Sequence, residues 1–217
     1  GQVLHHGVGG VAQQGGPEGG LDVDVVACIV VDPATPQKSL EEARALRARF
    51  DGKHPRLKVT ATKIYLDGVL EGETAALLHA YDTHPEHKGA INATPQSLNE
   101  TVALLEADGF QVHMHVIGDA ASRAALDAYA FSRAQKADVI DTRATLAHLQ
   151  LVDPADYIRF KALGVVVNAQ SLWAYPDTYI TGINTPQVGQ ARVDRMYPWG
   201  SLARAGARVV GGSDWPV

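Results

Sequence analysis

The chain has 217 residues, of which 46% are hydrophobic, and its formal net charge at pH 7 is −5. This supplies apolar material for one sizeable core and little more. The 19 basic residues are scattered among 24 acidic ones, which argues against a nucleic-acid partner. No segment reaches the roughly 20 apolar residues of a membrane span, and the first residues lack a signal-peptide pattern. We therefore expect a cytoplasmic globular protein with no membrane partner.

Residues 1–21 are rich in Gly and Gln and show no hydrophobic period, so we expect a loop or a disordered lead-in. From residue 22 to residue 217, short β-branched apolar runs alternate with helical stretches, which is typical of βα units around a parallel sheet. We expect about six strands in this domain. They are 24–31, 58–66, 111–117, 142–148, 164–170 and 208–214.

Capping patterns predict where the intervening helices begin. Ser39 and Glu42 form a capping box for the first helix, and Thr94 with Pro95 opens the second. Asp119 is the predicted N-cap of a helix over 119–135, and Asp153 precedes the next helix. A last helix is expected near 194–205, after a long polar loop over 171–191.

Two architectures fit this alternation, a βα barrel and an open doubly wound sheet, and the hydrophobic period does not distinguish them. The placement of polar side chains favours the barrel. In a βα barrel, side chains from different strands converge at the carboxyl ends of the strands. Such residues recur there in strand after strand: Lys63 with Asp67, His113 with His115, His148 with Gln150, Asn168 with Gln170, and Ser213 with Asp214.

His115 and His148 are separated by about one βαβ step of roughly 30 residues, so we expect them on neighbouring strands. Each imidazole would offer a neutral nitrogen to one metal ion. Asp214 would add a carboxylate or act as general base to a metal-bound water. Taken singly, each residue has an ordinary structural explanation, a hydrogen-bonded core histidine or a helix N-cap. Their shared placement favours the metal site.

His113 points the same way as His115, about 7 Å along the strand, which is too far for both to ligate one small ion equally. We expect His115 to be the ligand and His113 to support the site or contact substrate. Lys63 lies inside an apolar strand, where a lysine usually extends its amine to an exposed edge or pairs with an acid. A desolvated lysine has a lowered pKa and can act as a nucleophile or form a carbamate that bridges two metal ions.

Four segments, taken in order, resemble the second half of the metal-dependent amidohydrolase superfamily, specifically the amidohydrolase 3 (YtcJ-like) group. They are KIYLDGVLEGETAAL, VHMHVIGDAASRAALDAY, LAHLQLVDPADYIRFKALGVVVNAQ and ARVVGGSDWPV. The resemblance implies an α/β fold, a (β/α)8 TIM barrel with a small β-sandwich, and one or two divalent ions, commonly zinc. It also implies that Lys63 is the bridging, carboxylated lysine, that His115 and His148 are metal ligands, and that Asp214 binds metal and handles the proton.

Two features depart from the family pattern. The family's first strand carries a His-x-His metal pair, whereas His5 and His6 are adjacent and no such pair precedes Lys63. The chain also ends where a last helix and the sandwich would follow. We therefore expect an incomplete barrel of about six βα units, whose exposed edge favours a homo-oligomer. We also expect at most one weakly held divalent ion, a Lys63 that is unmodified or only partly carboxylated, and little or no amide hydrolysis by this chain alone.

The leading hypothesis is a metal-dependent hydrolase that cleaves amide or other C–N bonds, other than peptide bonds, of a small molecule. Metal-activated water would attack the carbonyl, Asp214 would carry the proton to the leaving nitrogen, and His113 would stabilise the oxyanion. The alternative is a degenerate amidohydrolase-like protein that binds or regulates without catalysis. A third hypothesis is a Schiff-base enzyme that uses Lys63.

Overall fold

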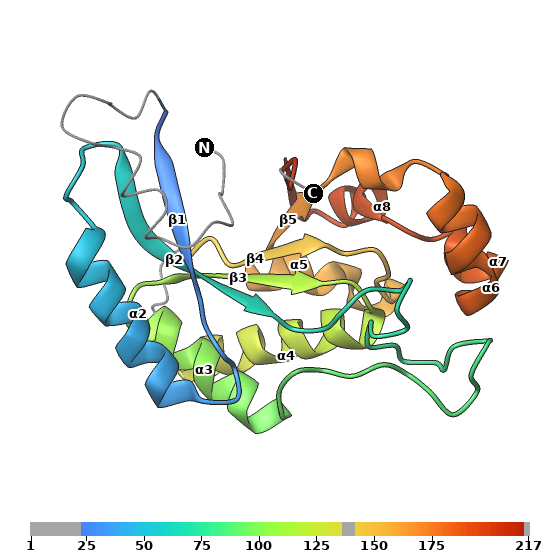
Figure 1. Ribbon diagram of the computed structural model, residues 1–217, viewed down its shortest axis with the longest axis horizontal. Helices are drawn as coiled ribbons and strands as arrows, with labels where there is room; N and C mark the ends of the chain where they lie inside the picture. Colours follow the sequence, from blue (N-terminus) through green and yellow to red (C-terminus); the bar gives the residue numbers. More distant parts are fainter. Residues whose placement is uncertain (1–22, 136–141, 215–217) are drawn as a thin grey trace.

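A computed structural model of the chain describes residues 23–135 and 142–214 (Figure 1). The predicted lead-in at 1–21 lies outside the described residues. The described residues form one sheet of six strands, and every neighbouring pair is parallel. The strands are β1 (Val25–Val30), β2 (Leu57–Tyr65), β3 (Gln111–Val116), β4 (Thr145–His148), β5 (Val166–Ala169) and β6 (Arg208–Gly211).

The strand order decides between the two predicted architectures. The strands lie side by side in chain order, from β1 to β6. A doubly wound sheet reverses its order at a switch point, whereas a βα barrel adds each strand beside the previous one. Among the described residues β1 and β6 each pair with a single neighbour, so this part of the chain forms an open arc of a barrel. The α/β, partial-barrel prediction is confirmed, and the homo-oligomer stays a prediction.

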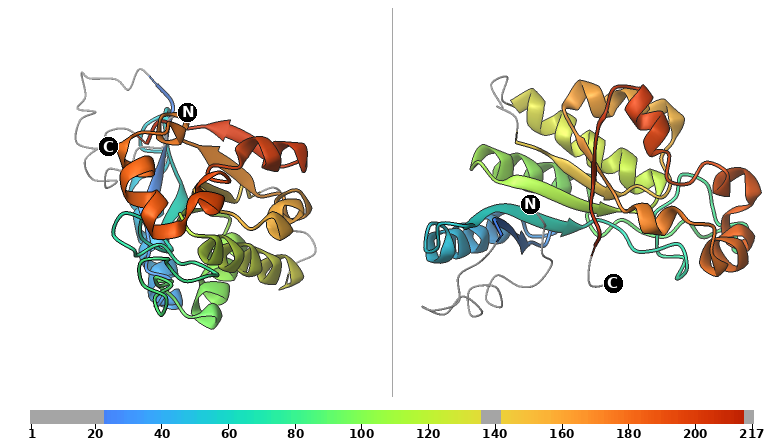
Figure 2. Two further views of the ribbon diagram at one scale, coloured as in Figure 1. Left: turned by 90° about the vertical axis from the view of Figure 1, so that its right-hand side faces the viewer. Right: turned by 90° about the horizontal axis from the view of Figure 1, so that it is seen from above.

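Helices cover one face of this arc (Figures 1 and 2). They are α2 (Pro36–Phe50), α3 (Pro95–Ala107), α4 (Asp119–Gln135), α5 (Tyr157–Leu163) and α8 (Trp199–Arg204). The main core lies between them and the sheet, and it contains Val112, Met114 and Val116 of β3. Alternation along β3 therefore points His113 and His115 to the opposite, barrel-interior face.

Helix starts were predicted with mixed success. Thr94 caps α3 as expected, because its hydroxyl oxygen accepts a hydrogen bond from Ser97 N at 3.1 Å. The capping box at Ser39 was wrong: α2 begins at Pro36, and the Ser39 hydroxyl donates to the Asp32 carbonyl at 2.7 Å. Proline at the first helical position is the signal that overrides the box, since its fixed φ suits a helix start.

The predicted loop over 171–191 is largely helical. It contains a 3₁₀ turn at Ser171–Ala174, a π-helix at Tyr179–Asn184, and the short helices α6 (Thr185–Val188) and α7 (Gln190–Val193). The predicted last helix is shorter than expected and begins at Trp199, after Tyr197 with a positive φ of 50°. No helix in the described ranges is long and apolar enough to cross a membrane.

Candidate active site

Lys63 lies in the interior of the arc, near the end of β2. The register pairs it with Val30 of β1 and His113 of β3. Its side chain is only 1% exposed, although it carries a titratable amine. Burial lowers the pKa of Lys63 to about 8, and the nearby Cys28 and Asp214 partly oppose this lowering. A lysine in this setting has a neutral, nucleophilic amine at mildly alkaline pH.

His115 lies two residues after His113 in β3, opposite Tyr65 of β2 and Ala147 of β4. Its Nε2 atom lies 2.9 Å from the carbonyl oxygen of Gly68. A carbonyl oxygen only accepts, so Nε2 carries the ring proton and donates it. In the neutral ring Nδ1 then holds the lone pair. A backbone carbonyl that fixes the tautomer in this way is the usual support of a metal-binding histidine.

His148 has a strained backbone that turns its ring toward His115. The register places His148 opposite Val116, which packs against the helices, so regular alternation would send the imidazole outward. Instead His148 has a φ of +73°, and Leu149 N donates to Ala147 O at 3.0 Å, which closes a γ-turn centred on His148. This turn is rare and strained in non-glycine residues. As a result, the two imidazole rings meet edge to face with centroids 4.6 Å apart.

Three groups hold His148 in this conformation. Gln170 Oε1 accepts from the backbone N of His148 at 3.0 Å, and Trp199 Nε1 donates to its backbone O at 3.0 Å. Trp173 stacks on the imidazole with ring centroids 4.7 Å apart and an interplanar angle of 9°. Sequence reasoning found Gln170 at its strand end but missed both tryptophans, because their positions in the 171–199 segment depend on tertiary packing.

Asp67 organises the loops at this end of the sheet. Its carboxylate accepts backbone hydrogen bonds from Ala76 at 3.0 Å, Ile117 at 3.0 Å and Gly118 at 2.8 Å. Burial raises the pKa of Asp67 to about 7, against these donors, which favour the charged form. Its Oδ1 also lies 3.9 Å from Nε2 of His115. Asp67 therefore joins the loop after β2 to the loop after β3.

The Gly118-Asp119 pair contacts the loop after β2, in the segment 75–78. A Cβ on Gly118 would lie 1.9 Å from the carbonyl oxygen of Ala76, so only glycine permits this approach. Asp119 is the first residue of α4, and its Oδ1 accepts from Leu78 N at 2.8 Å. The prediction that Asp119 is the N-cap of its own helix is therefore wrong: it anchors the 75–78 segment.

The remaining predicted residues are placed as follows. His113 is 2% exposed and lies beside Lys63, deeper in the arc than His115. Asp214 follows β6 with a φ of +57° and interacts electrostatically with Lys63. Lys63, His115, His148 and Asp214 lie in the carboxyl-terminal half of their strands or in the loops that follow, which is the active face of a βα barrel, whereas His113 is the third of the six residues of β3.

The described residues supply some, and not all, of the ligands that a divalent metal ion needs. The described residues contain no cluster of three or more His, Cys, Asp or Glu arranged for one ion. Two imidazoles do meet, and His115 has its tautomer fixed for ligation through Nδ1. Imidazole nitrogen suits zinc and its first-row neighbours. The described site thus supplies imidazole donors beside a lysine that can lose its proton, short of a full ligand set.

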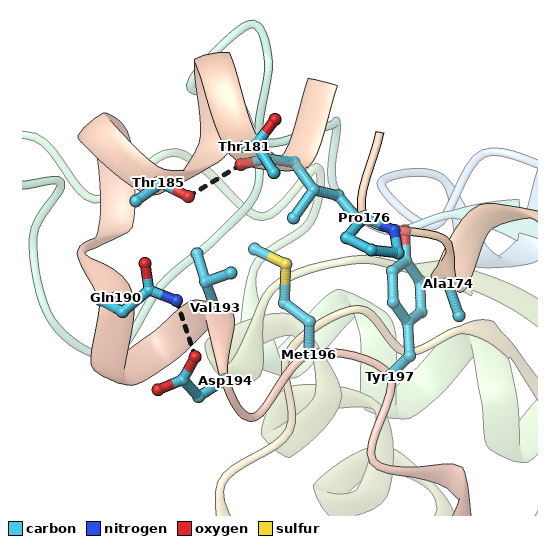
Figure 3. A pocket seen from close by; sticks show the side chains of 10 residues that line it. Ala174, Pro176, Thr181, Thr185, Gln190, Val193, Asp194, Met196 and Tyr197 are labelled. Atoms are coloured by element: carbon cyan, nitrogen blue, oxygen red, sulfur yellow. Dashed lines mark hydrogen bonds between the residues drawn. The ribbon is translucent and has the colours of Figure 1, made fainter. Parts of the chain in front are cut away.

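A pocket of about 360 Å³ lies within the 174–197 segment (Figure 3). Its walls include Ala174, which follows Trp173, and Met196 and Tyr197. Tyr197 N donates to the carbonyl oxygen of Gln150 at 2.9 Å, two residues beyond His148. The pocket therefore adjoins the ends of β4 and β5.

Comparison with known proteins places the chain in a family. The Amidohydro_3 model, described as "Amidohydrolase family", matches residues 3–217. The chain is 30% identical over 164 residues to Protein LONG AFTER FAR-RED 3 of Arabidopsis thaliana, covering 74% of this chain and 27% of that protein. It is 26% identical over 164 residues to YtcJ of Bacillus subtilis (strain 168), covering 75% of this chain and 30% of YtcJ. The chain thus spans less than a third of the length of these two relatives.

A solved structure supports the same fold. The crystal structure of an uncharacterized metal-dependent hydrolase from Pyrococcus furiosus superposes with a TM-score of 0.72 at 24% identity. The match covers 90% of this chain and 38% of that one. At this identity the likeness shows the fold alone. The family model, which spans nearly the whole chain, shows that this protein belongs to the amidohydrolase family of hydrolases.

Proposed function

We propose that the chain contributes Lys63, His115, His148 and Asp214 to a metal-dependent site that hydrolyses an amide or other non-peptide C–N bond of a small molecule. The inward turn of His148 carries this proposal. A γ-turn at a non-glycine residue costs on the order of 1–3 kcal/mol and persists where the surroundings enforce it. Here the surroundings enforce contact with His115, whose ring proton is committed to the Gly68 carbonyl.

In this proposal His115, through Nδ1, and His148 hold a divalent ion, for which zinc is the first choice. When bound, such an ion supplies a Lewis acid that polarises the amide carbonyl and makes water more acidic. Lys63, as its neutral amine, would add to carbon dioxide and release one proton to solvent, and the resulting carbamate would offer two oxygen donors. Asp214, half-buried at the mouth of the site, accepts the proton of the attacking water and passes it to the leaving nitrogen.

His113 has a different role. It lies too deep, and too far along β3 from His115, to share an ion equally with that residue. We assign it to the carbonyl oxygen of the substrate, where an imidazole N–H would stabilise negative charge. This separates two histidines of one strand by function, and the separation can be tested by substitution.

Zinc titration by calorimetry tests the proposal. The chain should bind about one zinc ion, and His148→Ala should weaken binding by at least about tenfold, because a direct ligand matters at least as much as its supporting groups. His113→Ala should change the affinity by less than about twofold. His54→Ala, at the amino end of β2, is the matched control for loss of one histidine.

Unchanged zinc affinity after His148→Ala would overturn the assignment of this ligand. A chain that binds no zinc at all would favour the alternative, an amidohydrolase-like protein that binds or regulates without catalysis.

A further inference from the structure

The pocket in the 174–197 segment is held in shape independently of any metal. One wall comes from the π-helix Tyr179–Asn184, which contributes Ile180 and Thr181. The end of that helix is fixed by Asn184, fully buried, whose amide donates to Glu71 Oε1 at 3.1 Å and accepts from Gln150 Nε2 at 3.1 Å. These bonds hold the π-helix wall in position relative to β4. A pre-formed cavity of this size is typical of small-molecule sites.

Two contacts join this pocket to the histidine site. Trp173, which stacks on His148, immediately precedes Ala174 in the pocket wall. Met196, whose side chain lies among the lining residues in Figure 3, approaches Gln150 Nε2 through its sulfur at 3.6 Å. Trp173, Val193 and Met196 also pack against one apolar cluster. The pocket wall is therefore joined through Trp173 to His148 and through Met196 to Gln150.

The lining determines which substituent fits. Among the described residues that form the pocket, Asp194 is the one charged residue and none is basic. The Asp194 carboxylate already accepts a hydrogen bond from Gln190 Nε2 at 2.7 Å. Burial raises the pKa of Tyr197 well above its usual value, so the phenol is uncharged at neutral pH. An anionic group would find no compensating charge here, whereas Ile180, Val193 and Met196 offer apolar contacts.

We propose that this pocket receives an uncharged, apolar substituent of the substrate, such as a short alkyl or phenyl group attached to the scissile amide. The inference deepens the proposed function and rests on it for the identity of the scissile bond. The binding of the substituent itself needs no metal. Each buried methylene should tighten binding by about fourfold, from the free energy of removing it from water.

The two methionines of the chain allow a direct test. Met196 lines the pocket, and Met114 lies in the main core with no exposed surface. Protein labelled with methyl-¹³C methionine should give one methyl resonance for each. Titration in the absence of metal with butanamide and then hexanamide should move the Met196 resonance and leave Met114 in place, with a Kd about fifteenfold lower for hexanamide, which has two more methylenes. The monoamide of adipic acid, which carries a carboxylate at its far end, should bind at least tenfold more weakly than hexanamide.

Variants that fill the pocket sharpen the result. Val193→Phe should weaken hexanamide binding at least fivefold. Thr181→Phe, at an exposed position, repeats the test with less risk to folding. Ile158→Phe, exposed on α5, is the matched control and should bind like the unaltered chain. An unchanged Met114 resonance shows that each variant is folded.

A stationary Met196 resonance, equal movement of both resonances, or equal binding of the adipic monoamide would each overturn the inference. Because the amide titrations contain no metal, their outcomes do not depend on whether the chain binds zinc. Amide binding without zinc affinity would refute the proposed function alone, and zinc affinity without amide binding would refute the pocket alone.

Discussion

Asp214, which follows β6, interacts electrostatically with Lys63 of β2, although β3, β4 and β5 separate their strands in the sheet. In a flat sheet with about 4.8 Å between strands, four spacings would put them roughly 19 Å apart. A charge interaction over that distance would be largely screened. The sheet is therefore curled, and its curvature brings residues from both sides of the arc to one place, as in a barrel.

The buried amine of Lys63 predicts a pH-dependent stability. Its folded pKa of about 8 lies below the ordinary value of 10.5. Between these values the unfolded chain binds more protons, so the free energy of unfolding should rise with pH, by up to about 3 kcal/mol. Lys63→Met removes the titration and should be the more stable protein at pH 7, with the difference shrinking toward pH 10. Urea unfolding from pH 7 to pH 10 measures this, and parallel curves for the two proteins would refute the buried-amine account.

Asp67 should be essential for stability in a way that its neighbour Asp119 is not. Asp67 Oδ2 accepts hydrogen bonds from both Ala76 N and Gly118 N. In Asp67→Asn the amide NH₂ group would face a backbone N–H donor, and the hydrogen bond to that donor would be lost. We expect a loss of about 2–4 kcal/mol in the free energy of unfolding. Asp119→Asn keeps a side-chain oxygen that can accept from the backbone N of Leu78, and it should cost less than about 1 kcal/mol. Equal losses in denaturant unfolding would contradict this difference.

Trp173 should act on zinc binding through the ring of His148. Trp173→Ala removes the stacked indole and should weaken zinc affinity by about threefold to tenfold, as expected for a group that supports a ligand. Trp173→Phe retains an aromatic face and should recover most of this loss. Tyr175→Ala, exposed two residues later, is the control. If all three variants bind zinc alike while melting at the same temperature, Trp173 does not position His148.

Much of the fold follows from local sequence patterns. The six strands lie where β-branched runs predicted them, and Thr94, Asp153 and Gly164 mark helix ends as expected. These signals depend on residues a few positions apart. The 171–191 segment was misassigned as a loop because its short helical turns are stabilised by distant partners, such as the bond from Asn184 to Glu71.

The strand-end positions of the candidate residues were predictable from the sequence, whereas their geometry was not, and their membership of one metal site stays a prediction. Polar residues at strand ends pointed to Lys63, His115 and His148, because strand ends converge in any βα barrel. The γ-turn at His148 has no sequence signature, since this turn is rare and strained and depends on the groups packed around it. The sequence pointed to Asp67 only because it lies near Lys63. The Asp-Gly pair directly after a strand was the signal that could have indicated that Asp67 accepts hydrogen bonds from loop backbone.

The tautomer of His115 tests the central claim most directly. Imidazole ¹⁵N resonances of histidine-labelled protein distinguish protonated from unprotonated ring nitrogens, and His115→Gln identifies the relevant signals. We predict that His115 has its proton on Nε2, held by the Gly68 carbonyl, and that zinc shifts the Nδ1 resonance while Nε2 stays protonated. A proton on Nδ1 in the metal-free chain, or an Nδ1 resonance that saturating zinc leaves unmoved, would contradict the account.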